Sequence, residues 1–275
     1  MTHGKKAYTR RVFLKDLGTL SVGMVTVGVA GCSPSDTAGT TTGAGAGTTA
    51  AVPGSTAAPS STGTSTTSGP SAQAPGWHRI NFDDFVSAYV VVRGGEAAIV
   101  DTGTASDAAP IDTALGELGV RWEDVSDVVA THNHRDHIGG FPAVAEQAVN
   151  ATLGIGEADI DPVASVGDVV GLVDGDNVFG MTVIATPGHT PGHISLHDPD
   201  LGVLFTGDAL NGGEVLDGEE GTVRGPNTSF TPDMPMALES IRRFEDLEFD
   251  ALAFGHGTPI ETGAKTELQR YLDSI

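Results

Sequence analysis

The segment Thr131-His132-Asn133-His134-Arg135-Asp136-His137 carries the most specific signal in this 275-residue chain. It places three histidines and one aspartate in the pattern His-x-His-x-Asp-His. His189 follows the last of these residues by 52 positions, Asp208 follows after another 19, and His256 after another 48. Neutral imidazoles and carboxylates are the ligands that zinc takes in catalytic sites. The set therefore predicts a two-metal hydrolytic centre.

These residues, in this order, resemble the metallo-β-lactamase-fold hydrolases, from about residue 77 to the C-terminus. The resemblance implies an α+β fold, a four-layer αβ/βα sandwich with the metals at one edge between two sheets. It implies that the first metal is held by His132, His134 and His189. It implies that the second is held by Asp136, His137 and His256, with Asp208 as a bridge between the two metals.

With an aspartate at the bridging position, the chain is similar to the thioester-cleaving glyoxalase II branch and to the lactone-cleaving branch. The same aspartate disfavours a β-lactamase. Two metals in such a centre share a water molecule whose pKa falls to about 7. The hydroxide that it forms attacks the ester-like bond. The resemblance implies that Asp136 takes the proton and that Asp208 holds the metals together. Two zinc ions suit these ligands best, and iron or manganese accept the same residue types.

Other residues near the ligands are expected to support the site or to line it. Asp101, in Asp101-Thr102-Gly103, is predicted to hydrogen-bond loop backbone near the ligands. His193, four residues after His189, is either a support for the ligands or inert. Arg135 either forms a salt bridge or meets an anionic substrate group. The glycine-rich segment from Asn211 to Asp233 is expected to overhang the metals. The pocket candidates are Asn227, Phe230 and Met234, whereas His78 and His197 are expected in exposed or turn positions.

The pattern of apolar runs places these ligands at strand ends. Strands are predicted at 86–93, 96–101, 127–131, 181–185, 194–197, 203–206 and 250–254. Helices are predicted at 106–118, 139–149, 232–247 and 264–274. Five times a β-rich run ends and a residue of a metal-binding type follows. A rigid scaffold of strands holds such residues more accurately than a free loop would.

The folded region is strongly acidic. From residue 76 onward it holds 9 Lys and Arg against 34 Asp and Glu, and the acids are scattered rather than blocked. This balance predicts a solvated surface adapted to high salt, as in a haloarchaeal protein; an ordinary acidic protein is the alternative. It disfavours binding to nucleic acid, so the expected partner is a small-molecule substrate.

The N-terminal part is predicted to be an export signal followed by a disordered tether. Residues 1–32 contain Arg10 and Arg11 in a twin-arginine export pattern, and Val29-Ala30-Gly31-Cys32 resembles a lipoprotein cleavage box. Cys32 would then carry the lipid, which would be the chain's only attachment to the membrane. Residues 33–75 are almost wholly Ser, Thr, Gly, Ala and Pro and are predicted to be a disordered tether. The hydrolase domain is predicted over 76–275, outside the cytoplasmic membrane.

Two other function classes remain open. Some relatives of this fold hold one iron and oxidise persulfides, and their ligands overlap with these. A non-catalytic metal-binding surface lipoprotein is the second alternative, although such a protein would not need all seven ligands. The leading hypothesis is an exported metallohydrolase that acts on a lactone, a thioester or a related bond.

Overall fold

The computed structural model describes residues 74–216 and 218–275. The predicted export signal with Arg10 and Arg11, the lipidation site Cys32 and nearly all of the predicted tether lie outside these described residues. No helix within the described ranges has the length and apolar character needed to cross a membrane.

The first sheet has six strands in the order β1-β2-β3-β4-β5-β6. They are β1 (Gly76–Phe82), β2 (Val86–Arg93), β3 (Glu96–Val100), β4 (Val125–Ala130), β5 (Thr152–Gly156) and β6 (Val169–Leu172). The pairs β1–β2 and β2–β3 are antiparallel, whereas β3 to β6 pair in parallel. Gly94 and Gly95 join β2 to β3 with φ angles of 60° and 91°, a turn that glycine forms without steric cost. The hairpin predicted at this point is confirmed.

The second sheet has five strands in the order β13-β10-β9-β8-β7. They are β7 (Asn177–Val178), β8 (Met181–Ala185), β9 (Ile194–Asp198), β10 (Val203–Gly207) and β13 (Ala251–Phe254). All neighbours are antiparallel except β10 and β13, which pair in parallel. A small third sheet joins β11 (Asn211–Gly212) to β12 (Val223–Arg224), inside the segment that the sequence predicts to be a loop.

Short helices connect and cover the sheets. The α-helices are α1 (Ala109–Glu117), α2 (Arg135–Ile138), α3 (Phe141–Gln147), α4 (Met234–Arg242) and α5 (Ala264–Leu272). The 3₁₀ turns are η1 (Trp122–Asp124), η2 (Glu157–Asp159), η3 (Asp161–Val163), η4 (Gly213–Leu216) and η5 (Arg243–Asp246). The helix predicted over 232–247 divides into α4 and η5. It starts where it does because the Asp233 carboxylate accepts a hydrogen bond from the backbone N–H of Met236 at 3.0 Å.

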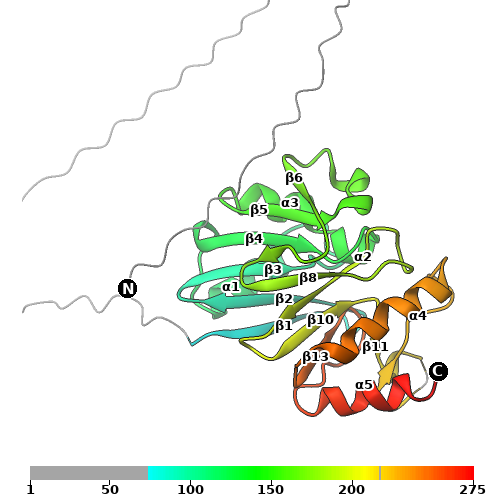
Figure 1. Ribbon diagram of the computed structural model, residues 1–275. Coiled ribbons are helices and arrows are strands. Elements are labelled where there is room, and N and C mark those ends of the chain that lie inside the picture. The colour runs from blue at the N-terminus through cyan, green and yellow to red at the C-terminus, as the bar shows by residue number, and fades with distance from the viewer. Residues whose placement is uncertain (1–73, 217) are drawn as a thin grey trace, which may run out of the picture. The chain divides into compact units, whose positions relative to one another are not determined.

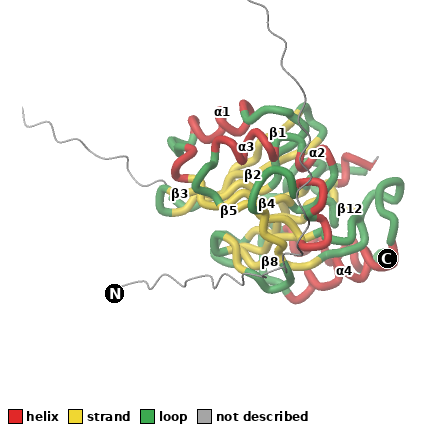
Figure 2. The backbone as a smooth tube through the Cα atoms, turned by 90° about the horizontal axis from the view of Figure 1, so that it is seen from above, coloured by secondary structure: helices red, strands yellow, loops and turns green. Residues whose placement is uncertain are grey.

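Three separate apolar cores show the four layers. One core packs α1 and α3 against the first sheet, through residues such as Ile111, Phe141 and Val128. A second fills the space between the two sheets, and a third packs α4 and α5 against the outer face of the second sheet. Figure 2 shows α1 and α3 on one side of the strands and α4 on the other. The predicted four-layer αβ/βα arrangement is therefore confirmed.

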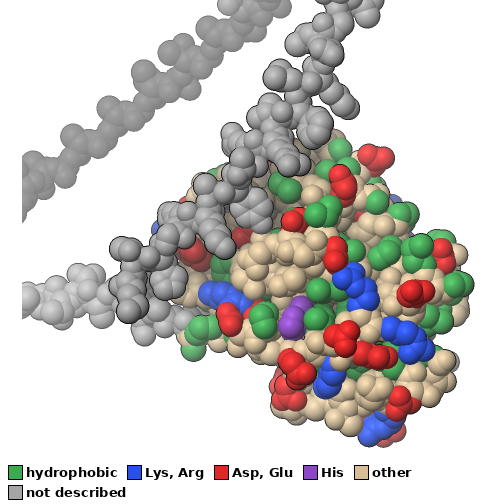
Figure 3. Space-filling view, viewed as in Figure 1, with side chains coloured by type: hydrophobic (Ala, Val, Ile, Leu, Met, Phe, Trp, Pro, Cys, Tyr) green, Lys and Arg blue, Asp and Glu red, His purple; other side chains and the backbone are tan. Residues whose placement is uncertain are grey.

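Most arginines of the described region lie close to acidic side chains. On the face seen in Figure 3, Asp and Glu side chains are dispersed among Lys and Arg. Several arginines pair with carboxylates: Arg93, Arg121, Arg242, Arg243 and Arg270. On that face the acids form no single block, in keeping with their scattered positions in the sequence.

Candidate metal centre

The seven ligand candidates come together at one edge of the two sheets, each just beyond a strand or in the first turns that follow it. They lie after β4 and in α2, after β8, after β10 and after β13 (Figure 1). In that order they are His132, His134, Asp136, His137, His189, Asp208 and His256. They form two groups, within each of which one ligand atom from every residue lies within 4.8 Å of the others.

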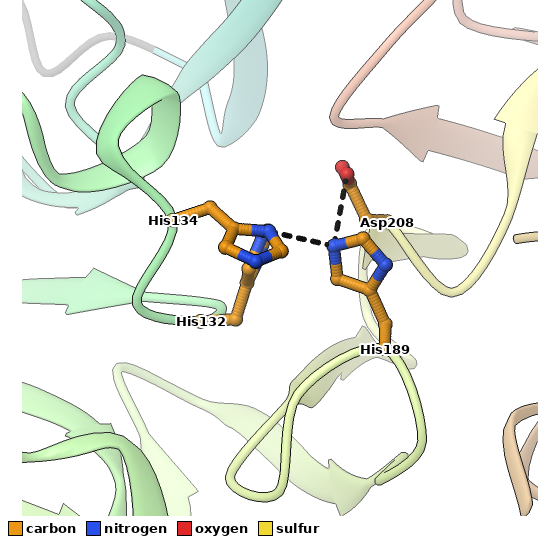
Figure 4. A group of neighbouring side chains, drawn as sticks. All are labelled: His132, His134, His189 and Asp208. Atoms are coloured by element: carbon orange, nitrogen blue, oxygen red, sulfur yellow. Dashed lines mark hydrogen bonds and ion pairs between the residues drawn. The ribbon is translucent and has the colours of Figure 1, made fainter. Parts of the chain in front are cut away.

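The first group consists of His132, His134, His189 and Asp208 (Figure 4). Nδ1 of His134 lies 3.1 Å from Nε2 of His132 and 2.9 Å from Nε2 of His189. Nε2 of His189 lies 3.3 Å from Oδ2 of Asp208. Three ring nitrogens and one carboxylate oxygen thus face one small space, although the residues come from three separate loops.

The second group consists of Asp136, His137 and His256. Nε2 of His256 lies 3.3 Å from Oδ2 of Asp136 and 3.5 Å from Oδ2 of Asp208. Nε2 of His137 lies 3.1 Å from Oδ1 of Asp208. Asp208 therefore contacts members of both groups, which is the position that a bridging carboxylate needs.

Nε2 of His137 and Oδ1 of Asp208 are both buried, and although they lie 3.1 Å apart, neither makes a hydrogen bond of proper geometry with any described residue. Buried polar atoms almost always have a partner, because leaving one unpaired costs free energy. A divalent cation accepts lone pairs from imidazole and carboxylate alike, so it would satisfy both atoms. The residues present therefore fit divalent metal ions.

The protonation of the ring nitrogens also bears on metal binding. Burial lowers the pKa of His189 to about 4, so this imidazole is neutral at pH 7. Burial also disfavours the charged form of His256, but its contacts with Asp136 and Asp208 outweigh burial and raise its pKa to about 10. A metal bound by the second group must therefore displace a proton from His256.

Asp101 fixes both ends of the segment 131–137, which carries four of the ligand candidates. Its buried carboxylate accepts hydrogen bonds from the backbone N–H of Thr131 at 2.7 Å and from the Thr131 hydroxyl at 2.9 Å. Its Oδ2 also lies 2.8 Å from Nδ1 of His137. This contact leaves Nε2 of His137 directed at Asp208. A carboxylate on the far nitrogen fixes the tautomer and orientation of a ligating histidine.

His193 supports Asp208 rather than joining either group. Its Nε2 accepts a hydrogen bond from the backbone N–H of Asp208 at 3.1 Å. Its Nδ1 lies 2.8 Å from the hydroxyl of Thr186, which is then the acceptor. His193 is buried, and its ring lies 5.0 Å from that of His132. The structure thus favours a supporting position over an inert one.

Asp159 is a functional candidate that sequence reasoning missed. Its buried carboxylate accepts hydrogen bonds from the backbone N–H of Asn133 at 3.1 Å and of Gly192 at 2.8 Å, and from the hydroxyl of Thr190. These partners flank His132, His134 and His189, so one side chain ties two ligand loops together. No local signal marks it, because Glu157 and Asp161 stand two residues before and after it and carry the same type of side chain.

Two more contacts fix the outer faces of ligand rings. Nδ1 of His189 lies 3.0 Å from the hydroxyl of Thr231, and Nδ1 of His256 donates to the carbonyl oxygen of Phe85 at 2.5 Å. His78 and His197 lie outside the site. The expectation of exposure was wrong for His197, which is buried in β9 with its Nε2 2.9 Å from the carbonyl oxygen of Glu248.

A cavity of about 610 Å³ opens onto the cluster. Four ligand candidates line it, and so do the pocket candidates Arg135, Asn227 and Phe230, whereas Met234 does not. The segment 211–233 contributes much of the wall, as predicted, and backbone pairing holds it there. The N–H of Gly212 donates to the carbonyl of His256 at 2.9 Å.

The sequence and the fold both match known proteins. Residues 81–256 match the family model of the metallo-beta-lactamase superfamily. The chain is 37% identical over 122 residues to a hydroxyacylglutathione hydrolase of Cereibacter sphaeroides, which covers 42% of this chain and 44% of that protein. It is 46% identical over 103 residues to the probable metallo-hydrolase YflN of Bacillus subtilis, covering 34% and 38%. The chain thus spans about half the length, or less, of these curated relatives.

Solved structures share the fold. A metallo-beta-lactamase family protein from Thermus thermophilus superposes with a TM-score of 0.53 at 24% identity, over 72% of this chain and 79% of that one. A second protein, crystallised in a di-iron-bound form, gives a TM-score of 0.55 at 22% identity, over 69% and 95%. The family model covers most of the described region and both ligand groups. This chain therefore belongs to the metallo-beta-lactamase superfamily.

Proposed function

We propose that this chain is a metal-dependent hydrolase that cleaves an ester-like bond in a small molecule. The observation that supports this most strongly is the position of Asp208. Its carboxylate contacts His189 of one ligand group and His137 and His256 of the other. Asp208 itself lines the cavity, as does His256. A binding protein would not need a carboxylate shared between two groups at the wall of a cavity.

The first metal ion would be held by His132, His134 and His189, and the second by Asp136, His137 and His256, with Asp208 between them. When bound, such ions act as Lewis acids and lower the pKa of water, so the chain needs no serine or cysteine nucleophile. We propose zinc in both positions, and iron or manganese would accept the same ligands.

Asp136 is the residue that we assign to proton transfer. Its side chain is 25% exposed and lines the cavity, whereas Asp208 is buried more deeply. Burial favours the neutral form of Asp136, but its hydrogen bond with His256 and the charge of His137 keep its pKa below the ordinary value. Asp136 is then ionised at neutral pH and can accept the proton that water loses when it attacks.

The bond that is cleaved is a thioester, a lactone or a related carboxylic ester. Relatives named hydroxyacylglutathione hydrolase support the thioester. Export from the cytoplasm would favour a lactone or another ester met outside the cell. In each case water adds across the carbonyl, the bond from carbon to sulfur or oxygen breaks, and the leaving thiol or alcohol takes up a proton.

The proposal is tested on the full chain, purified in high-salt buffer. Elemental analysis gives the bound metal, and turnover is measured on a thioester, a lactone, a phosphodiester and a β-lactam. About two zinc ions per chain with turnover of the thioester or the lactone is the expected result. One iron per chain without hydrolysis would instead support the persulfide-oxidising alternative, and tight metal binding without any turnover would support a binding protein.

We further propose that the enzyme acts outside the cytoplasm, anchored only by a lipid on Cys32, and that Arg10 and Arg11 direct its export. Replacing both arginines by lysine keeps the charge but removes the twin-arginine pattern, so the precursor should stay in the cytoplasm. Cys32→Ser is the matched control, because it should still be exported but should not partition with membranes. Fractionation and immunoblotting measure both, and normal surface delivery of the double variant would contradict the export route.

A further inference from the structure

Arg135 is unusual among the cationic side chains of the described region. Five of the eight arginines pair with carboxylates, and Lys265 donates to three backbone carbonyls. Arg79 donates to the hydroxyl of Ser87 at 2.8 Å. The guanidinium of Arg135 is exposed and has neither an ion pair nor a hydrogen bond within the described ranges. This is notable because residues 76–275 hold 34 Asp and Glu against 9 Lys and Arg.

The position of Arg135 suits direct contact with a substrate. It lies between the ligand candidates His134 and Asp136, and it lines the same 610 Å³ cavity as they do. No other arginine or lysine of the described region lines that cavity. A guanidinium presents a planar fork of N–H donors that matches a carboxylate, and the pair is strongest where water is partly excluded.

The rest of the wall divides into uncharged donors and apolar surface. Thr104 and Ser106 line the cavity, as does Asn227, whose Oδ1 accepts a hydrogen bond from the N–H of Ser229 at 3.0 Å. Three apolar side chains line the same cavity and are 57%, 40% and 64% exposed: Phe85, Val215 and Phe230. These side chains suit the neutral body of a substrate. Apart from the ligand cluster itself, only Arg135 offers a charge among the described residues of the wall.

We propose that Arg135 binds a carboxylate of the substrate and thereby selects anionic esters or thioesters over neutral ones. Because it lies next to two metal-ligand candidates, it would hold the anion close to the bond that is cleaved. The fixed charge excess of the protein repels anions at long range, so the selection must come from this direct contact. The inference rests on the proposed hydrolase function and adds the class of substrate.

The test uses two pairs of probes that differ in one charge. The first pair is S-acetyl-3-mercaptopropionate, whose leaving thiol carries a carboxylate, and the corresponding neutral amide. The second pair is 4-nitrophenyl hydrogen glutarate, whose acyl group carries a carboxylate, and the neutral 4-nitrophenyl pentanoate. In at least one pair the wild-type chain should hydrolyse the anionic probe with a kcat/KM at least about tenfold higher than that for its neutral partner. A difference of this size is expected for a charge-assisted hydrogen bond. Hydrolysis without preference in either pair would overturn the inference while leaving the proposed function intact.

Variants then assign the preference to Arg135. Arg135→Gln should reduce the ratio to near unity, mainly by raising KM for the anion, and Arg135→Lys should retain part of it. Arg224→Gln is the control, because Arg224 is also an exposed arginine without a carboxylate partner in the described region, but it does not line the cavity. It removes the same charge and should keep the wild-type ratio.

Two outcomes separate the causes of failure. The metal content of every variant is measured, and an Arg135→Gln chain that holds its metal yet keeps the preference would overturn the role of Arg135. If the wild-type chain binds metal but hydrolyses neither member of either pair, nor the wider panel, the hydrolase function fails and the substrate assignment fails with it.

Discussion

Asp208 and Asp101 show how two carboxylates of the same type take different positions in one site. Asp208 directs its oxygens at ring nitrogens of both ligand groups, and one oxygen has no hydrogen-bond partner among the described residues. Asp101 uses both oxygens on Thr131 and His137, so it has little left for a metal. Its φ of 61° is left-handed, a conformation that Asp and Asn adopt more readily than most residues.

Replacing Asp208 by Asn should lower the metal content and abolish hydrolysis. The amide keeps the shape but loses the negative charge that offsets two divalent ions, and its NH₂ group cannot serve as a ligand. Asp200→Asn is the control, because its side chain is 82% exposed and it belongs to neither ligand group. Metal analysis and turnover of both variants provide the check, and full activity of Asp208→Asn with two bound metals would contradict the shared-carboxylate model.

The ligand loops depend on elements that contribute no ligand. β5 ends at Gly156, and the turn η2 that follows it places Asp159 between the loops after β4 and β8. The His-x-His-x-Asp-His segment and the later ligands could be predicted, because strand ends and ligand residue types are local features of the sequence. Asp159 could not, because its importance comes from three hydrogen bonds to residues 26 to 33 positions away.

The strand β1 illustrates the same limit. Its sequence mixes polar and apolar residues and most of its side chains are half-buried, so no periodic pattern marks it. It forms because β2 offers a free edge over its whole length. By contrast β2 was predictable, since its continuous Val-rich run is buried on both faces between two of the apolar cores.

Replacing Asp159 by Asn should weaken metal binding without removing a ligand. One amide oxygen can still accept hydrogen bonds, but the second acceptor is lost, and the loops that carry His134 and His189 loosen. Supporting residues of this kind change metal affinity by about 10- to 100-fold. Competition with a chromophoric chelator measures the affinity. Asp161→Asn in the next turn is the matched control, and equal affinities for the two variants would argue against a positioning role.

Across the whole chain the dominant property is the net charge of −22, and all of the negative excess comes from residues 76–275, where 34 Asp and Glu face 9 Lys and Arg. Such an excess destabilises a compact state through self-repulsion, and salt weakens that repulsion within a Debye length of about 10 Å at 0.1 M and 3 Å at 1 M. The few Lys and Arg side chains of this region cannot offset the acids. This is the physical basis for the expectation of adaptation to high salt.

The free energy of unfolding should therefore rise as the sodium chloride concentration is increased from about 0.1 M to well above 1 M. Urea titrations at each salt concentration measure it, because urea adds no ions of its own. The rise should be steepest at the low end of this range, where screening changes most, and should persist when metal is kept saturating. A flat or falling curve would mean that the acid excess has no such role and that the chain is an ordinary acidic protein.

The central claim is that the two ligand groups hold metal ions on which hydrolysis depends. The most direct measurement follows metal content and turnover together on the full chain, before chelation, after chelation and after zinc is added back. The account predicts about two ions per chain, loss of turnover with the metal, recovery with zinc, and a melting temperature about 10 °C lower for the metal-free chain. Turnover that survives complete removal of metal would contradict it.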